Sequence, residues 1–322
     1  MNEPEGERPR TPALPEDYRE VFLSQVSVVT IAEPPRRNSP LVLFAVLCIV
    51  LVGIAWIAVL GKVTSGGLST TVEGTAYAVG EHGVGQRPRA DPGSLAELAA
   101  NPVLVPGAAL RSAACDLPDL DTGAGELESY YRKGITCLDE AWRPVLTSVN
   151  LPFRSPGLNI ADDPRTKCGF APHEDEATAF YCARDKIIYM PRERLIRDAG
   201  DETAYHLAVL AHEYGHHVQA QAGILRAVQD QERVADEAEL LELSRRVELQ
   251  ANCFAGAFLA AVAGNGSVDK DLAQASVDSF DDTVNSDTHG SRKNQSAWAK
   301  AGFEGKSSAS CNTWQAPSDE VK

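Results

Sequence analysis

Two histidines and a glutamate are spaced for metal chemistry in the stretch LAVLAHEYGHHVQAQAG, residues 207–223. His212 and His216 are four residues apart, so on a helix they project from one face, about a turn from each other. Two imidazoles in this arrangement can bind one tetrahedral zinc ion. Glu213 follows the first histidine, where its carboxylate can take a proton from a water that the metal activates. The spacing therefore predicts a catalytic zinc site.

The pattern His-Glu-x-x-His is the arrangement that zinc peptidases use to cleave peptide bonds, and a chance match has odds on the order of one in a hundred for this composition. The surrounding apolar residues predict a buried helix, and we expect Gly215 to leave room over the metal. An alternative interpretation makes the two histidines hydrogen-bonded core residues with Glu213 as their ion partner. The direction of His217 differs from that of the pair and indicates a supporting or surface role.

A catalytic zinc site needs a third protein ligand, and the best downstream candidate is Glu248, in the stretch RRVELQANCFAGAFLAAV. It belongs to an apolar pattern of helical spacing over residues 238–262. Asn252 follows one turn later on the same face, where its side-chain carbonyl can accept the outer N–H of a ligating histidine. The small residues 255–257 would permit a close approach of the two helices. From spacing alone, Glu248 could equally be a surface carboxylate beside two arginines.

The elements that must position these residues are mostly helical. The first helix is expected from near Glu202 to a C-cap at Gly223. Two β-rich runs around a short turn predict a hairpin over residues 179–191. Shorter helical patterns follow at residues 272–284 and 293–303. Few strands and several long helices predict an α+β fold in which helices predominate.

The formal net charge of the 322-residue chain is −15. This argues against a nucleic-acid partner, because such proteins need a basic face to displace counterions from phosphate. Residues 41–60 contain no charge or strongly polar group and match the roughly 30 Å hydrocarbon core of a bilayer. The sequence therefore predicts a single-pass transmembrane helix. Arg36 and Arg37 precede it closely and Lys62 alone follows, which favours a cytoplasmic N-terminus and an extracytoplasmic C-terminal part.

The rest of the chain divides by composition. The segment before the apolar span is rich in proline, glutamate and arginine and is expected to be disordered. The segment after it is rich in glycine, alanine, threonine and proline and is expected to be flexible. The expected order is a cytoplasmic tail (1–40), the transmembrane helix (41–60), a juxtamembrane stalk (61–110), a catalytic domain (111–316) and a polar tail (317–322).

Six of the seven cysteines follow the apolar span, and the seventh, Cys48, lies inside it. An even number on the extracytoplasmic side suits disulfides, since cytosolic reductants do not act there. Buried free thiols are the alternative.

An ordered set of motifs extends the similarity beyond the histidine pattern. The segments AHEYGHHVQ, ELQANCFAG and HGSRKNQSAWAKAGFEG…CNTW, with FYC…D…IYM upstream, resemble the bacterial family of putative neutral zinc metallopeptidases over roughly residues 115–314. The resemblance implies a zincin-like catalytic domain with one Zn²⁺ per chain, a peptide or protein substrate, and commonly an N-terminal membrane span. It also implies that the zinc ligands are His212, His216 and Glu248 and that the catalytic base is Glu213.

The same resemblance bears on two further residues. Where the family usually reads E-L-Q-A-D, this chain has Asn252, whose neutral amide would accept the histidine N–H more weakly than a carboxylate. This departure puts activity in doubt more than zinc binding. His289 matches a Ser-His-Gly-like family position, and near the zinc it would stabilise the oxyanion formed when water adds to a peptide carbonyl. A helix-capping or surface role is the alternative for His289.

The resemblance also implies two disulfides, Cys168–Cys182 and Cys253–Cys311. Elimination would then pair Cys115 with Cys137, which is one of the possible connectivities. These pairs are expectations from the resemblance, not from spacing.

We predict a membrane-anchored zinc peptidase that contacts the lipid bilayer through residues 41–60 and holds its catalytic domain outside the cytoplasm. Glu213 would take the proton of the attacking water and later deliver it to the leaving amine. The edge of the 179–191 hairpin could align an extended peptide by strand addition. Two alternatives remain open. One is a zinc-binding but catalytically weak adaptor or sensor, for which Asn252 is the reason, and the other is a metal-free interaction domain held together by disulfides.

Overall fold

The computed structural model describes residues 94–173 and 177–322 of the chain. The predicted cytoplasmic tail (1–40), the predicted transmembrane helix (41–60) and residues 61–93 of the predicted stalk lie outside these ranges. Within the described ranges, no helix is both long enough and apolar enough to cross a membrane.

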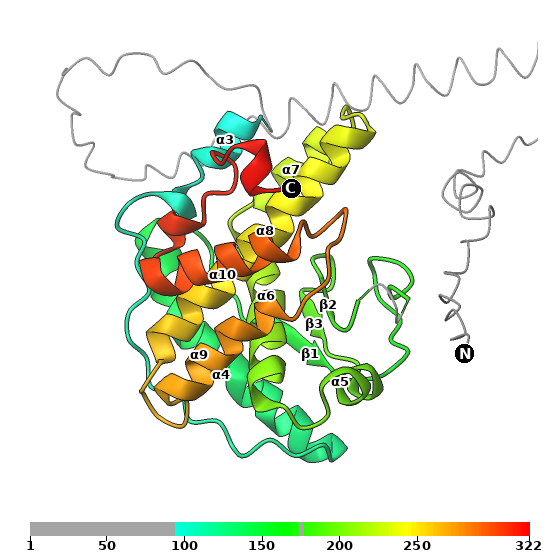
Figure 1. Ribbon diagram of the computed structural model, residues 1–322, viewed down its shortest axis with the longest axis vertical. Coiled ribbons are helices and arrows are strands. Elements are labelled where there is room, and N and C mark those ends of the chain that lie inside the picture. The colour runs from blue at the N-terminus through cyan, green and yellow to red at the C-terminus, as the bar shows by residue number, and fades with distance from the viewer. Residues whose placement is uncertain (1–93, 174–176) are drawn as a thin grey trace, which may run out of the picture. The chain divides into compact units, whose positions relative to one another are not determined.

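Helices predominate among the described residues, and a small three-stranded sheet accompanies them (Figure 1). This confirms the predicted α+β class with a helical majority. The helices are α3 (Leu95–Ala99), α4 (Ala124–Ser148), α5 (Arg192–Ala199), α6 (Thr203–Gln221), α7 (Ile224–Glu232), α8 (Glu237–Val262), α9 (Lys270–Asp278) and α10 (Arg292–Gly305). The strands are β1 (Gly157–Asn159), β2 (Phe180–Cys182) and β3 (Ile187–Tyr189).

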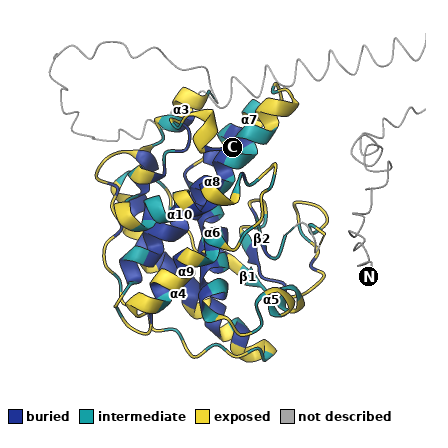
Figure 2. Cartoon of the chain, viewed as in Figure 1, coloured by how far each residue is buried: buried dark blue, intermediate teal, exposed yellow. Residues whose placement is uncertain are grey.

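Helix α6 is buried along most of its length, and it crosses α8 closely in the middle of the domain (Figure 2). The crossing is possible because Gly215 has no side chain. A Cβ added at Gly215 would lie 2.9 Å from the carbonyl oxygen of Ala251 on α8. Gly215 therefore admits the neighbouring helix backbone, and the expectation that it leaves room over the metal is wrong.

A second pair of glycines lets α8 pack tightly against α10. A Cβ at Gly256 would overlap the carbonyl oxygen of Ala299, and one at Gly302 would overlap the carbonyl oxygen of Cys253. The small run at residues 255–257 was expected to serve the approach of α6 to α8. Its glycine faces α10 instead, so the small residues of α8 serve two different neighbours.

Helix α4, which the sequence did not predict, packs against α6. Its Tyr131 hydroxyl lies 2.5 Å from His206 Nδ1 at the start of α6. Asp139, also on α4, accepts a hydrogen bond of 2.6 Å from the hydroxyl of Tyr214. All four side chains are buried. Polar bonds in the core therefore fix the rotation and height of α6 relative to α4.

The sheet has the order β1-β3-β2, with β1 parallel and β2 antiparallel to the central strand β3. Strands β2 and β3 form the hairpin predicted over residues 179–191, and Phe180 pairs with Tyr189. Lys186 closes the turn with a φ of 57°. Because β2 is an edge strand, one of its sides has no strand partner within the described sheet.

Two segments expected to lie outside the packed domain belong to it. Leu98 and Val103, in the second part of the predicted stalk, are at most 1% exposed, and the Ser308 hydroxyl donates to the Val103 carbonyl over 2.6 Å. In the predicted polar tail, Val321 is fully buried and Asn294 Nδ2 donates to the Lys322 carbonyl over 2.7 Å. Both segments are too short to show a hydrophobic period. Their few apolar residues therefore did not predict that they pack against the domain.

We predict that Gly302→Ala destabilises the domain by about 2–3 kcal/mol, because the added methyl group must push two helix backbones apart. The midpoint of urea or thermal unfolding, followed by circular dichroism, measures the effect. Gly125→Ala is the matched control, since its Cβ would meet nothing within 4 Å in an exposed part of α4. That control should be neutral or slightly stabilising. Equal midpoints for the two variants would contradict the proposed role of the glycine contact.

Candidate metal centre and active site

The side chains of His212, His216 and Glu248 converge at one point where α6 meets α8. The Nε2 atoms of the two histidines lie 3.1 Å apart. Glu248 Oε2 lies 3.3 Å from Nε2 of His212 and 3.2 Å from Nε2 of His216. The three side chains are between 12% and 18% exposed. The crossing of α6 and α8 thus brings Glu248 close to two histidines that precede it by more than thirty residues in the sequence.

Hydrogen bonds to the outer ring nitrogens orient both histidines. His212 Nδ1 lies 2.7 Å from Asn252 Oδ1, and His216 Nδ1 lies 2.9 Å from Gln219 Oε1. An amide oxygen can only accept a hydrogen bond, so each Nδ1 carries the proton and donates it. Each neutral ring then presents the lone pair of Nε2 toward Glu248. Two lone pairs and a carboxylate oxygen therefore point at the same place.

Three acceptor atoms at this separation repel one another unless a cation lies among them. A tetrahedral zinc ion with bonds of about 2.0–2.1 Å separates its ligand atoms by about 3.3 Å. The observed separations are 3.1 to 3.3 Å. Glu248 Oε2 is buried, and in the described part of the chain the Nε2 atoms of His212, His216 and His289 lie within 3.5 Å of it. Two imidazole nitrogens and one carboxylate oxygen form the donor set of catalytic zinc sites, so these residues fit a zinc ion.

The metal-free chain meets the same requirement for positive charge with a proton. Burial opposes protonation of His216, but the Glu248 carboxylate overrides this effect and raises the pKa of His216 to about 9. Burial alone would raise the pKa of Glu248, but the charge of His216 and its contacts with both histidines hold it well below the usual range. A proton or a metal ion can supply the positive charge, and a bound metal would displace the proton.

Glu213 lies in the same helix turn and faces the same cleft as His212. Its side chain is 5% exposed, and among the described residues its Oε2 atom has no hydrogen-bond partner. Burial raises the pKa of Glu213, and the nearby charges of His212 and His216 oppose this shift. A buried carboxylate with a raised pKa and a free oxygen can accept and return a proton.

A cleft of about 690 Å³ opens in front of these residues. Side chains of α6 form one wall, among them Tyr205 and Val209. The chain before β2, residues 177–179, forms a second wall, and residues from the loop between α9 and α10 form the third. Most of the lining residues are polar, and apolar side chains such as Val209 and Phe280 supply the rest. A ligand in this cleft could therefore make both hydrogen bonds and apolar contacts.

His289 lies on the loop between α9 and α10 and reaches the edge of the metal centre. Its Nε2 atom is 3.5 Å from Glu248 Oε2, and its side chain is 42% exposed. Its Nδ1 atom lies 2.9 Å from the Thr288 hydroxyl. The cap of α10 is Ser291, whose side chain accepts from the Asn294 amide, so His289 does not cap that helix. The structure thus places His289 beside the cleft and not on a remote surface.

Two further polar side chains of α6 make hydrogen bonds to other elements, and one of them also contacts a ligating histidine. Gln219 was not singled out, although it follows His216 by three residues, close enough along a helix to meet it. It orients His216 while its own Nε2 donates to the Val247 carbonyl over 2.8 Å. His217 is fully buried and joins other elements: its Nε2 donates to the Arg154 carbonyl over 2.6 Å, and its Nδ1 accepts from the Tyr181 hydroxyl over 2.9 Å.

Three disulfides hold segments around this centre. They join the segment before α4 to α4, a loop to β2, and α8 to a short 3₁₀ helix (Ser308–Cys311). The pairs are Cys115–Cys137, Cys168–Cys182 and Cys253–Cys311. They are the same pairs that the resemblance and elimination gave.

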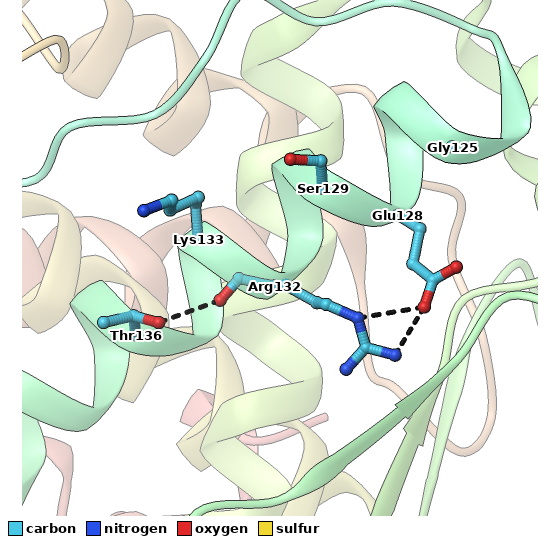
Figure 3. A pocket seen from close by; sticks show the side chains of 6 residues that line it. All are labelled: Gly125, Glu128, Ser129, Arg132, Lys133 and Thr136. Carbon is cyan, nitrogen blue, oxygen red and sulfur yellow. Dashed lines mark hydrogen bonds and ion pairs between the residues drawn. The ribbon is translucent and has the colours of Figure 1, made fainter.

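A separate hollow of about 380 Å³ lies on the exposed face of α4 (Figure 3). Some of its polar groups bond one another within the helix. Arg132 pairs with Glu128, and the Thr136 hydroxyl donates to the Arg132 carbonyl over 3.0 Å. Nothing in this hollow combines burial with unsatisfied polar atoms, so we assign it no chemistry.

Comparisons with known proteins agree with the geometry at the level of the family. An Escherichia coli (strain K12) protein, uncharacterized protein YpfJ, is 32% identical over 171 residues, which cover 47% of this chain and 58% of that protein. A Mycobacterium tuberculosis (strain ATCC 25618 / H37Rv) protein, uncharacterized protein Rv2575, is 29% identical over 210 residues, which cover 56% of this chain and 68% of that protein. This chain therefore matches just over half the length of the Escherichia coli relative.

No solved structure matches the chain significantly. The family described as "Putative neutral zinc metallopeptidase" matches residues 121–314. This range contains both helices of the metal centre, the cleft and His289. The chain therefore belongs to this family of neutral zinc metallopeptidases.

Proposed function

We propose that the protein is a zinc-dependent peptidase in which His212, His216 and Glu248 hold one Zn²⁺ ion. The observation that supports this most directly is the convergence of two imidazole lone pairs and a buried carboxylate oxygen within 3.3 Å of one another. When bound there, zinc lowers the pKa of water and polarises a carbonyl group. The family match supports the same reaction class.

Glu213 acts as the general base and then as the general acid. Glu213 lines the cleft, and its Oε2 has no hydrogen-bond partner among the described residues, so it can accept the proton of the attacking water and deliver it to the leaving amine. The raised pKa of Glu213, caused by burial, lets it hold that proton between the two steps. Asn252 and Gln219 keep the ligating rings in the tautomer that leaves Nε2 free.

His289 stabilises the oxyanion that forms on the substrate carbonyl. It lies at the mouth of the centre, 3.5 Å from Glu248 Oε2, and its exposed part faces the cleft. A peptide or protein substrate would lie in the cleft beside residues 177–179, which lead into the edge strand β2. An extended peptide could add to this edge through backbone hydrogen bonds.

The proposed setting is the extracytoplasmic side of a membrane. Residues 41–60 are long and apolar enough for one span, and arginines gather on their N-terminal side, which favours a single-pass protein with a cytoplasmic N-terminus. Three disulfides in the domain suit an oxidising compartment. The acidic charge of the chain argues against nucleic acid as a partner.

A second candidate function, a zinc-binding domain with weak or no catalysis, rests on Asn252. The structure places its amide oxygen 2.7 Å from His212 Nδ1, where the family usually has an aspartate. A neutral acceptor makes the histidine a less basic ligand. Such a domain would bind zinc stoichiometrically as an adaptor or sensor and would not turn over peptides.

We predict that the purified full-length chain binds one zinc ion and that Glu248→Ala weakens zinc affinity by more than about 100-fold, since loss of even a supporting group costs about 10–100-fold. Competition with a fluorescent chelator measures the affinity. Glu237→Ala, which changes an exposed glutamate of the same helix, is the control and should bind zinc like the wild type. Unchanged affinity in Glu248→Ala would remove this residue from the ligand set.

We also predict that Glu213→Gln lowers peptide turnover by about 10²–10⁴-fold while zinc content stays the same, because the amide fills the same space but cannot accept the proton. Cleavage of a peptide library by wild type and variant, with zinc measured in both samples, tests this. Equal rates would eliminate Glu213 from the mechanism.

Asn252→Asp separates the two candidate functions. A carboxylate in this position should tighten zinc binding by about tenfold or more. If the wild type is a peptidase, the variant keeps its activity; if the wild type is a weak adaptor, turnover rises from background in the variant. Zinc affinity that does not change in Asn252→Asp would show that the contact with His212 does not tune the metal.

A further inference from the structure

A second cavity lies at the end of β2 that is farther from the metal centre. We call this cavity the basic cup. Its volume is about 690 Å³. Four cationic side chains line it, from three separate segments of the chain, and one carboxylate, Glu232, faces them. The cations are Arg154, Arg184, Lys186 and Arg226. A local excess of positive charge in a chain with a net charge of −15 requires an explanation.

The cations of the basic cup are not neutralised from within the part of the chain that the structure describes. No ion pair to Arg154, Lys186 or Arg226 occurs there. The guanidinium of Arg184 has only a distant contact, 3.5 Å from the Lys167 carbonyl. Four cations that share one carboxylate leave a local excess of positive charge, which attracts an anionic ligand.

A further guanidinium adds to this potential from α4. Arg143 lies over the ring of Phe153, 4.5 Å from its centroid, and Phe153 lines the basic cup. The cup thus combines an aromatic surface with several cations, a combination that holds a peptide better than it holds a lone ion.

Hydrogen bonds around a buried histidine form the floor of the basic cup. His217 is fully buried, and it bonds both the Arg154 carbonyl and the Tyr181 hydroxyl. Gln221 Oε1 accepts from the Arg154 amide over 2.5 Å. The Cys168–Cys182 disulfide anchors the neighbouring loop to β2. The backbone of Arg154 is therefore fixed while its guanidinium stays exposed, as a binding site requires.

Strand β2 connects the basic cup to the cleft of the metal centre. Ala179, just before the strand, lines the cleft, and Ala183, just after it, lines the cup. At about 3.3 Å per residue, the four steps between them span about 13 Å. A peptide that lies along the β2 edge with its scissile bond at the metal would therefore reach the cup about four residues away.

We propose that the basic cup binds the acidic side chains of the peptide substrate, about four residues from the bond that is cleaved. This inference rests on the proposed peptidase function for its link to the cleft. Arginine side chains match carboxylates through paired N–H donors, and an extended chain in the cleft would deliver such groups at this distance. The protein would then select substrates by a short acidic stretch on one side of the cleavage site.

The test measures binding without cleavage. The full-length Glu213→Gln chain is titrated with two fluorescent peptides that share an uncharged core and end in four glutamates or in four glutamines. The acidic peptide should bind about tenfold more tightly, as two or three exposed charge contacts would give, and the difference should shrink at high salt. Arg154→Gln with Arg226→Gln should abolish the difference. These changes spare the structural bonds of Arg154, which use its backbone.

Arg111→Gln with Lys133→Gln removes the same charge from exposed positions outside the basic cup and should leave the preference intact. Arg154→Glu with Arg226→Glu should shift the preference toward a peptide that ends in lysines. Equal binding of the acidic and neutral peptides by the parent chain would overturn the proposal. So would binding to vesicles of anionic phospholipid without binding of the acidic peptide.

The same peptides distinguish failure of the basic cup from failure of the peptidase function. If the wild type binds the acidic peptide selectively but cleaves neither peptide, the result supports the basic cup and contradicts the proposed peptidase function. If it cleaves both peptides with the same kcat/KM and binds them equally, the result supports the peptidase function and contradicts the proposed role of the basic cup.

Discussion

A buried carboxylate that faces two imidazole lone pairs cannot remain without a positive charge, and the centre of this protein is organised around that constraint. Glu248 comes from one helix and the histidines from another, so the constraint acts across the packed core. Against the effect of burial, the Glu248 carboxylate raises the pKa of His216, so the site attracts positive charge even when a proton must supply it. A metal ion meets the same electrostatic requirement and leaves both rings neutral.

This arrangement depends on how closely the helices approach each other. Gly215 brings α6 onto α8, and Gly256 with Gly302 brings α10 onto the other side of α8. A displacement of about 1 Å where α6 crosses α8 would separate the ligand atoms beyond what one ion can bridge, since bond lengths at zinc vary little. Tyrosine hydrogen bonds to α4 add a further restraint on α6. Gly215 therefore supports the geometry of the ligands without contacting them, and Gly256 and Gly302 hold α8 against α10.

The sequence predicted the parts of the fold that have a strong local signal. Helical periodicity and the spacing of His212 and His216 located α6, and the hairpin followed from two β-rich runs. Gln219 was missed because glutamine has no fixed chemical meaning until its neighbours are known. The packed segment at Leu98 and Val103 was missed because short elements carry too few residues to show a period. Which neighbour each glycine serves depends on tertiary contacts that sequence spacing does not encode.

The two carboxylates of the centre limit which residue can support His212 at position 252, where this chain has Asn252. Glu213 and Glu248 both lie in the buried region, and the charge of Glu248 already adds to the raised pKa of Glu213. An aspartate at position 252 would strengthen His212 as a ligand, but it would place a third negative charge near Glu213 and raise that pKa further. With a neutral amide, two carboxylates balance one divalent ion. The departure from the usual family residue therefore makes His212 a less basic ligand and keeps the pKa of Glu213 lower than an aspartate at position 252 would.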